Sequence, residues 1–174
     1  MMALETALGL AYSHAAGILH RNLRSANVFL TDDGHPKIFG FFKGRVTSKL
    51  SENKWTDAEQ LRWTAPEMLA WERPPYDEKC DIFSLGVIMW ELITGDSPFS
   101  DSPGIAQMLK ERKKNKIRLH FQGLESNIPF LVAFKQVSHD CMEDNPQQRP
   151  DLDSVVERLM LLAPEDMCVP VGGG

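Results

Sequence analysis

The chain contains two long segments in which apolar residues recur at the spacing expected of helices. The first lies near the start and ends before Gly17; its apolar face consists of Leu4, Ala7, Leu8, Ala11 and Tyr12. The second covers residues 81–94 and is apolar nearly all round. A helix without a polar face belongs at the centre of a domain, so we expect residues 81–94 to form the middle of the core.

The second half of the chain predicts three more helices. One begins near Ser102-Pro103, with Ser102 as its cap and Pro103 in the first turn. The next covers about Phe130 to Met142. The last has Asp151 as its cap and presents one apolar face, formed by Leu152, Val155, Val156, Leu159 and Leu162.

Strands are predicted at only one place. Two short apolar runs, 28–30 and 37–39, flank an Asp-Gly turn at residues 31–34, which is a strong hairpin signal. Residues 43–62 are polar and aperiodic and predict a long loop. We therefore expect a mainly α fold with one short β-hairpin, folded as a single domain over residues 1–163 and followed by a loose tail at 164–174.

Composition excludes several classes of protein. The 174 residues are 43% hydrophobic and 25% charged, which is typical of a globular protein, and 19 basic against 24 acidic residues leave a formal charge of −5. Nucleic-acid binding is not expected from this charge. The three cysteines form no C-x-x-C pair, and no apolar run is long enough to cross a bilayer. With no basic leader at the start, the chain is expected to be cytoplasmic.

One segment carries a recognisable chemical motif. Residues 20–27, His-Arg-Asn-Leu-Arg-Ser-Ala-Asn, resemble the catalytic loop H-R-D-L-x-x-x-N of protein kinases. The resemblance implies that Asn22 stands where the family has its aspartate base, and that Asn27 stands where the family holds magnesium. Arg24 lies between them and belongs to the same candidate catalytic set. Because a carboxamide takes up no proton at neutral pH, Asn22 removes the base.

Three further segments resemble the large lobe of eukaryotic protein kinases, in the family's order. Residues 65–67 match A-P-E, residues 81–86 resemble D-x-x-S-x-G, and residues 145–150 resemble the stretch before the last helix. The resemblance implies a structural ion pair between Arg149 and Glu67. It also implies that the Asp81 carboxylate accepts backbone hydrogen bonds from the catalytic loop. Arg24 and residues 62–67 favour the tyrosine kinases or the tyrosine-kinase-like group. Pro98-Phe99 is slight evidence against a true tyrosine kinase, since that group usually has Pro-Tyr here.

The family's magnesium motif, D-F-G, lacks its acid in this chain. An ungapped alignment places it at Gly40-Phe41-Phe42, and a gapped one at Ile38-Phe39-Gly40. The candidate cofactor positions are therefore Asn27, Gly40 and Phe41. The sequence also contains neither the Gly-rich loop nor the V-A-I-K lysine of the small amino-terminal lobe. We expect the small lobe to be absent and no cofactor to bind, although the family uses ATP and Mg²⁺.

Several residues allow a structural and a functional interpretation. His20 is expected to be a packed core histidine, and Arg21 either pairs within the loop or binds a phosphorylated residue. The phenylalanines either fill the vacant nucleotide pocket or pack in the core (Phe39, Phe41, Phe42). The basic run 110–118 is either a solvated helix end or a docking site for an acidic partner.

The resemblance implies a pseudokinase-like large lobe that acts as a binding or allosteric scaffold in phosphorylation signalling. Its expected partner is a protein or the missing small lobe, with no nucleic acid and no membrane. Apolar surface is expected near Leu30, Ile38 and Phe41, where the small lobe would sit. Two alternatives stay open: a fragment of an active kinase that transfers the ATP γ-phosphoryl to Ser, Thr or Tyr, and a remnant that folds poorly.

Overall fold

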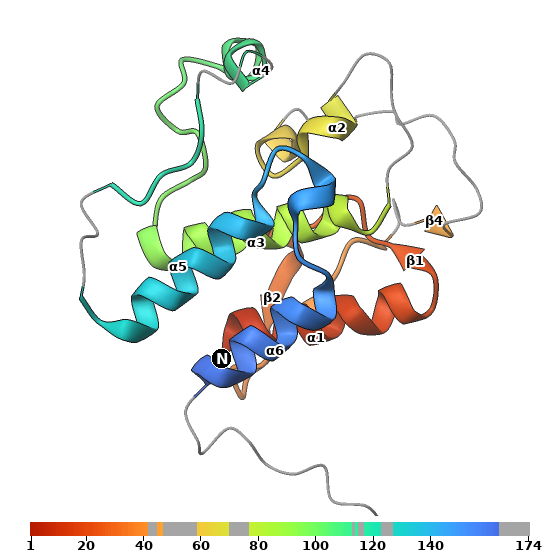
Figure 1. Cartoon of the computed structure of the whole chain (residues 1–174). Coiled ribbons are helices and arrows are strands. Elements are labelled where there is room, and N and C mark those ends of the chain that lie inside the picture. The colour runs from red at the N-terminus through yellow and green to blue at the C-terminus, as the bar shows by residue number, and fades with distance from the viewer. Residues whose placement is uncertain are drawn as a thin grey trace, which may run out of the picture.

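The chain folds around one central helix, with other helices packed on it and two small antiparallel sheets (Figure 1). The structure is a computed structural model that describes residues 1–41, 45–46, 59–69, 77–112, 114, 117–122 and 127–163. The helices are α1 (Met2–Ala15), α2 (Pro66–Leu69), α3 (Lys79–Thr94), α4 (Ile105–Arg112), α5 (Pro129–Cys141) and α6 (Leu152–Leu162). The strands are β1 (Ile18–Leu19), β2 (Val28–Leu30), β3 (Pro36–Ile38) and β4 (Arg45–Val46).

Helix α3 is the centre of the molecule, as its uniformly apolar sequence predicts. All residues from 80 to 90 are buried, and Gly95 ends the helix in the left-handed region at φ 71°. Helices α1 and α5 pack against α3, and α6 lies across both α1 and α5. The core between them contains fully buried aliphatic side chains, among them Leu10, Leu85, Met89, Val137 and Leu159. The prediction of a mainly α fold with a short hairpin is confirmed.

The close approach of α3 and α5 depends on Gly86. A Cβ atom at this position would lie 2.7 Å from Cys141 Cβ and 3.0 Å from the carbonyl oxygen of Ser138, both on α5. The Ser138 hydroxyl donates a 2.8 Å hydrogen bond to the Gly86 carbonyl across the same contact. Two residues earlier, the Ser84 hydroxyl donates to the carbonyl of Trp63 at 2.9 Å. The small residues of this motif therefore join α3 to its neighbours.

The predicted hairpin is present beside α1. Strands β2 and β3 pair antiparallel, with Val28 opposite Ile38 and Leu30 opposite Pro36. The turn is closed by a 2.8 Å hydrogen bond from the Gly34 amide to the Thr31 carbonyl, and Gly34 has φ 85°, a conformation that glycine adopts readily.

The structure differs from the sequence-based expectations at several places. Helix α4 begins at Ile105 and not near Ser102, and the Gly104 carbonyl accepts the Met108 amide of its first turn. Asp151 is the N-cap residue of α6, but its carboxylate pairs with Lys79 and forms no cap hydrogen bond.

The predicted loop 43–62 is also interrupted by regular structure. It contains β4, which pairs antiparallel with β1, and ends in a 3-10 helix at Glu59–Arg62. The predicted tail at 164–174 lies outside the described residues. Of the described helices, none is long and apolar enough to cross a membrane.

Candidate functional site

The segment that resembles the catalytic loop runs from β1 to β2, and Asp81 fixes its first turn. The Asp81 carboxylate accepts the backbone amides of His20 and Arg21, each at 2.7 Å, and it is fully buried in the first turn of α3. Its Oδ2 atom also lies 2.9 Å from Nε2 of His14, at the end of α1. These contacts are the ones that the resemblance implies for Asp81. The contribution of His14 has no signal in the motif.

Arg21 needs this anchor because its backbone is strained. Its φ of 62° lies in the left-handed region, which is uncommon for a residue with a long side chain. Such a conformation persists where its surroundings fix it, and the bond from the Arg21 amide to Asp81 does so. The Arg21 side chain is buried within the loop region, in agreement with a structural role.

His20 is buried and neutral. Its Nδ1 atom accepts the Asn22 amide at 3.2 Å, so Nε2 carries the proton and donates to the Phe39 carbonyl at 2.8 Å. Burial lowers the pKa of His20 below its ordinary value, against the opposing effect of the Phe39 hydrogen bond. The ring meets Phe41 edge to face, with centroids 4.5 Å apart. His20 therefore joins the catalytic-type loop to the segment of the degenerate magnesium motif.

Position 22, where the family has its aspartate base, is buried. Asn22 is 7% exposed, and its Oδ1 atom has no hydrogen-bond partner within the part of the chain that the structure describes. The backbone carbonyl of Asn22 accepts a 2.7 Å hydrogen bond from Nδ2 of Asn27. The side chain at position 22 therefore offers a buried amide oxygen, which can accept a hydrogen bond but cannot remove a proton at neutral pH.

Asn27 and Gly40 lie against each other where the family binds magnesium. The Phe39 amide donates to the Asn27 carbonyl at 2.8 Å, which brings Gly40 to the Asn27 side chain. Gly40 has φ 92°, and a Cβ atom there would lie 2.9 Å from Asn27 Nδ2 and 3.0 Å from its Cγ. Since Mg²⁺ requires several oxygen ligands at octahedral geometry, the single amide oxygen of Asn27 beside a glycine without a side chain is a poor site for it. The described residues contain no cluster of three His, Cys, Asp or Glu side chains that could bind a metal.

The aromatic residues of the candidate nucleotide side lie largely at the surface. Phe29 and Phe39 are each 55% exposed and meet edge to face at 5.1 Å. The core interpretation of Phe39 is therefore wrong, because this residue follows β3 at the surface and its ring stays exposed. Phe41 packs on His20 and is partly exposed, while Phe42 lies outside the described residues.

The expected apolar surface is present in part. Leu30 is 56% exposed and Phe41 is also accessible, but Ile38 is half-buried and contacts α1 at Gly9. The exposed apolar face consists of Phe29, Leu30, Phe39 and Phe41, which we call the hairpin face.

A second set of contacts, which the motif analysis missed, holds the middle of the loop to α3. Glu91 accepts the Ser25 hydroxyl at 3.0 Å and the Trp63 indole at 2.7 Å. Burial raises the pKa of Glu91, although both hydrogen bonds oppose that shift. Arg24 lies half-buried at the start of the 3-10 turn Ser25–Asn27. The available signal for Glu91 was an acid in the second half of the otherwise apolar helix 81–94.

The ion pair implied by the resemblance is present and bidentate. Arg149 Nη1 and Nη2 donate to Oε1 and Oε2 of Glu67 at 2.7 and 2.8 Å. The remaining N–H groups of Arg149 bind backbone carbonyls of Glu143, Lys79 and Asp144, and its guanidinium lies over the Phe83 ring at 5.1 Å. Every donor of a buried cation thus has an acceptor, which is the condition for such a pair to be tolerated. It fixes α2 to the segment before α6.

The basic run 110–118 proved not to be uniformly solvated. Arg112 lies partly buried, and its guanidinium donates to the carbonyls of Leu61 and Thr64 at 2.9 and 2.8 Å. Burial lowers the pKa of Arg112 to about 10. Arg118 is exposed and pairs with Asp144. Within this run, Arg112 therefore holds α4 to the 3-10 helix 59–62 and is not available to an acidic partner.

Comparison with known proteins agrees with this geometry. The model of the protein kinase domain matches residues 1–160. Serine/threonine-protein kinase STY46 of Arabidopsis thaliana is 30% identical over 173 residues, covering 94% of this chain and 27% of the relative. Serine/threonine/tyrosine-protein kinase HT1 of the same plant is 29% identical, covering 98% and 41%. The mixed lineage kinase domain-like protein of Mus musculus is 30% identical, covering 88% and 32%.

The chain thus spans less than half the length of these curated relatives. The family model covers nearly the whole chain, and the four motif segments occupy the positions that a kinase large lobe requires. The prediction of the family, with its tyrosine-kinase-like affinity, is confirmed. The chain belongs to the protein kinase domain family.

Proposed function

We propose that this chain is a catalytically silent kinase lobe that works by binding protein partners in phosphorylation signalling in the cytoplasm. The observation that carries the proposal is the presence of Asn22 and Gly40 at two positions where the family has carboxylates. The first position lacks a proton acceptor, and the second lacks a carboxylate for magnesium. Kinases gain nearly all their rate from positioning and charge neutralisation, so the loss of both groups removes several orders of magnitude.

The test is γ-phosphate transfer to peptide mixtures by the purified chain, with Asn27→Ala as the matched control. We expect no transfer above background, and no rise in melting temperature with magnesium-ATP, because ligand stabilisation requires binding at the concentration used. The double variant Asn22→Asp/Gly40→Asp is also expected to stay silent, since the sequence contains no phosphate-binding lysine or Gly-rich lid. Transfer that requires magnesium and disappears in Asn27→Ala would overturn the proposal.

The alternative function is that of an active kinase whose remaining parts lie outside these residues. It is favoured by the names of the plant relatives, which are called protein kinases. The same transfer assay decides between the two functions. An active kinase, run on the same peptides, shows that the assay detects transfer.

The hairpin face supports a protein partner. Phe29, Leu30 and Phe39 are each more than half exposed in or directly beside the hairpin, and the rings of Phe29 and Phe39 are in contact. Exposed apolar surface that is contiguous usually marks an interface. The relatives contain additional residues beyond the matched region, and a small-lobe segment is the occupant that we propose.

Without such a segment, the chain is expected to self-associate in sedimentation velocity. The variant Phe29→Ser/Phe39→Ser should shift the protein toward the monomer, whereas Leu161→Ser, on an exposed residue of α6, should not. A monomeric wild-type chain at high concentration would contradict this part of the proposal.

A further inference from the structure

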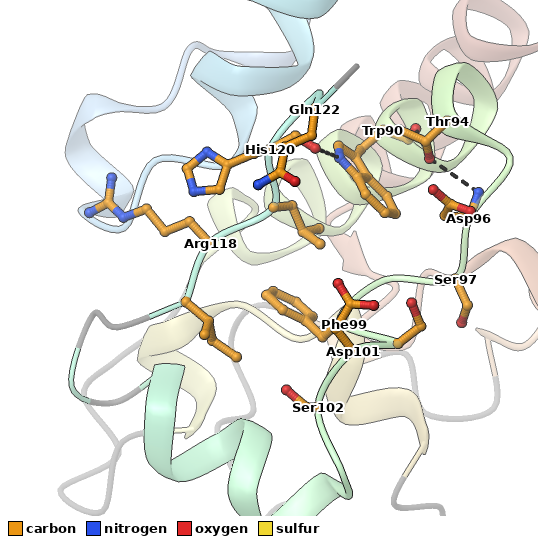
Figure 2. A pocket seen from close by; sticks show the side chains of 13 residues that line it. Trp90, Thr94, Asp96, Ser97, Phe99, Asp101, Ser102, Arg118, His120 and Gln122 are labelled. Carbon is orange, nitrogen blue, oxygen red and sulfur yellow. Dashed lines mark hydrogen bonds between the residues drawn. The ribbon is translucent and has the colours of Figure 1, made fainter. Parts of the chain in front are cut away.

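A cavity of about 380 Å³ opens at the carboxyl end of α3, away from the motif residues discussed above. Three segments enclose it: the last turn of α3, the loop 96–102 and the segment 117–122 (Figure 2). Its volume falls within the range of pockets that bind small ligands or side chains of a partner. None of the catalytic-type positions Asn22, Asn27 and Gly40 lines it.

The lining of the cavity is more polar than apolar, and the apolar part of its wall is held in place. Trp90, Phe99, Ile117 and Leu119 contribute aromatic and aliphatic surface. The Trp90 indole donates a 2.9 Å hydrogen bond to the His120 carbonyl, which fastens the segment 117–122 to α3.

Phe99 is fixed by two arginines that do not line the cavity. Arg62 Nη1 donates to the carbonyls of Pro98 and Phe99 at 2.8 and 2.7 Å. Arg112 places its guanidinium 4.9 Å from the centroid of the Phe99 ring. The cavity is therefore preformed, which reduces the cost of ordering when a ligand binds.

Two carboxylates give the cavity its charge. Asp96 and Asp101 line it and are exposed, and neither side chain has a hydrogen bond or ion pair with the residues that the structure describes. The one cationic guanidinium in the lining, Arg118, is paired with Asp144. In Figure 2 the side chains of Arg118 and His120 extend away from the two aspartates.

We infer that this cavity binds an arginine side chain of a basic protein segment. A guanidinium stacks on aromatic faces and forms forked hydrogen bonds to carboxylates, and its aliphatic stem suits the apolar wall. An ammonium group lacks the planar shape, and an anion would meet two unpaired carboxylates. The acidic net charge of the chain, −5, favours the approach of a basic segment. The inference adds a partner chemistry to the proposed binding function and does not depend on catalytic silence.

The test is fluorescence anisotropy with a labelled nine-residue peptide that carries two arginines among glycine and serine. The same peptide with citrulline keeps the shape and removes the charge. We expect the arginine peptide to bind and the citrulline peptide not to bind. The variant Asp96→Asn/Asp101→Asn should weaken binding of the arginine peptide at least fivefold. The matched control, Asp32→Asn/Asp153→Asn, removes the same charge from exposed sites elsewhere and should change binding less than twofold.

Three results would overturn the inference: no binding by the wild-type chain, equal weakening by the two double variants, or equal binding of the citrulline peptide. N-acetyl-arginine amide is run in parallel, and binding as tight as that of the peptide would assign the cavity to a free small guanidinium instead. Melting curves check that each variant folds. If Asp96→Asn/Asp101→Asn does not fold, the single variants Asp96→Asn and Asp101→Asn are measured in its place. Phosphoryl transfer is not measured, so this result and the test of the proposed function can fail separately.

Discussion

The structural frame of the lobe and its catalytic positions differ in how much of the family's chemistry they retain. The frame is complete: Asp81 holds two amides of the loop, and Glu67 meets Arg149 with two hydrogen bonds. The catalytic positions have lost both of their carboxylates, at Asn22 and Gly40. Substitution of a buried charged frame residue leaves a partner unmatched, whereas Asn22 and Gly40 are not members of an ion pair in the frame. The difference indicates that the structural contacts of the family are retained at positions where its catalytic carboxylates are not.

The largest effect is expected at the ion pair. Arg149→Ala should lower the free energy of unfolding by about 3–5 kcal/mol, because the buried Glu67 carboxylate loses its partner. Glu67→Ala should cost less, since Arg149 keeps three backbone carbonyls as acceptors. The double variant should cost much less than the sum of the single changes in denaturant melts.

The control for this pair is Arg158→Ala. Arg158 pairs with Asp140 at 2.8 Å, but both side chains are about one third exposed, so its loss should cost no more than about 1 kcal/mol. Additive losses at Glu67 and Arg149, or an equal loss at Arg158, would contradict the role of the ion pair in the frame.

The next effect is expected at Asp81. Asn has one oxygen in place of two, so Asp81→Asn leaves one of the amides of His20 and Arg21 without an acceptor, at a cost of about 1–3 kcal/mol. Hydrogen exchange should report faster exchange at these two amides. Asp32→Asn, in the exposed hairpin turn, should stay within about 0.5 kcal/mol of the wild type. Unchanged protection of the amides at positions 20 and 21 would show that Asp81 does not hold the loop in place.

A smaller effect is expected from overpacking. Gly86→Ala should destabilise by about 1–3 kcal/mol, because the added methyl group meets the backbone and side chains of α5. Gly104→Ala is the matched control, since a Cβ atom there meets nothing within 4 Å. Thermal melts of the two variants should therefore differ, and equal melting temperatures would show that α3 and α5 can separate without cost.

The smallest effect is a dependence on pH. The pKa of His20 is lowered in the folded chain, so below about pH 6.5 the unfolded state takes up a proton that the folded state does not. Stability is therefore lost as the pH falls through that value, by at most about 1.4 kcal/mol per pH unit. His20→Asn should remove this component, and unfolding curves between pH 7 and 5 compare the slopes. Identical slopes would show that His20 protonates equally well in both states.

The sequence predicts the frame better than the surface, for a physical reason. The helix 81–94 is apolar nearly all round, so its central position can be predicted from its residues alone. The Asp-Gly turn predicts the hairpin in the same way. The sequence places the start of α4 too early because Ser102-Pro103 are residues typical of a helix start. In the structure the helix begins at Ile105, and the loop 96–102 before it contains Phe99 in a strained left-handed conformation.

The candidate site was predictable as a set of positions but not as a set of contacts. The motif identifies Asn22, Asn27 and Gly40, yet the closeness of Asn27 to Gly40 depends on a backbone hydrogen bond at Phe39. Arg112 stands among lysines in a basic run, and its hydrogen bonds to the carbonyls of Leu61 and Thr64 are not visible in that run. Contacts between distant segments of this kind leave no periodic trace in the sequence.

The contact between Asn27 and Gly40 has a consequence for every substitution at position 40. Any side chain that returns to position 40 meets the Asn27 amide and must displace it from the Asn22 carbonyl that it binds. The backbone at φ 92° adds a further cost for every residue other than glycine. A mutation that restores the acid is therefore harmful before it is useful, and its effect depends on residue 27. Positions 27 and 40 are thus coupled, and a change at one of them alters which side chains the other can accept.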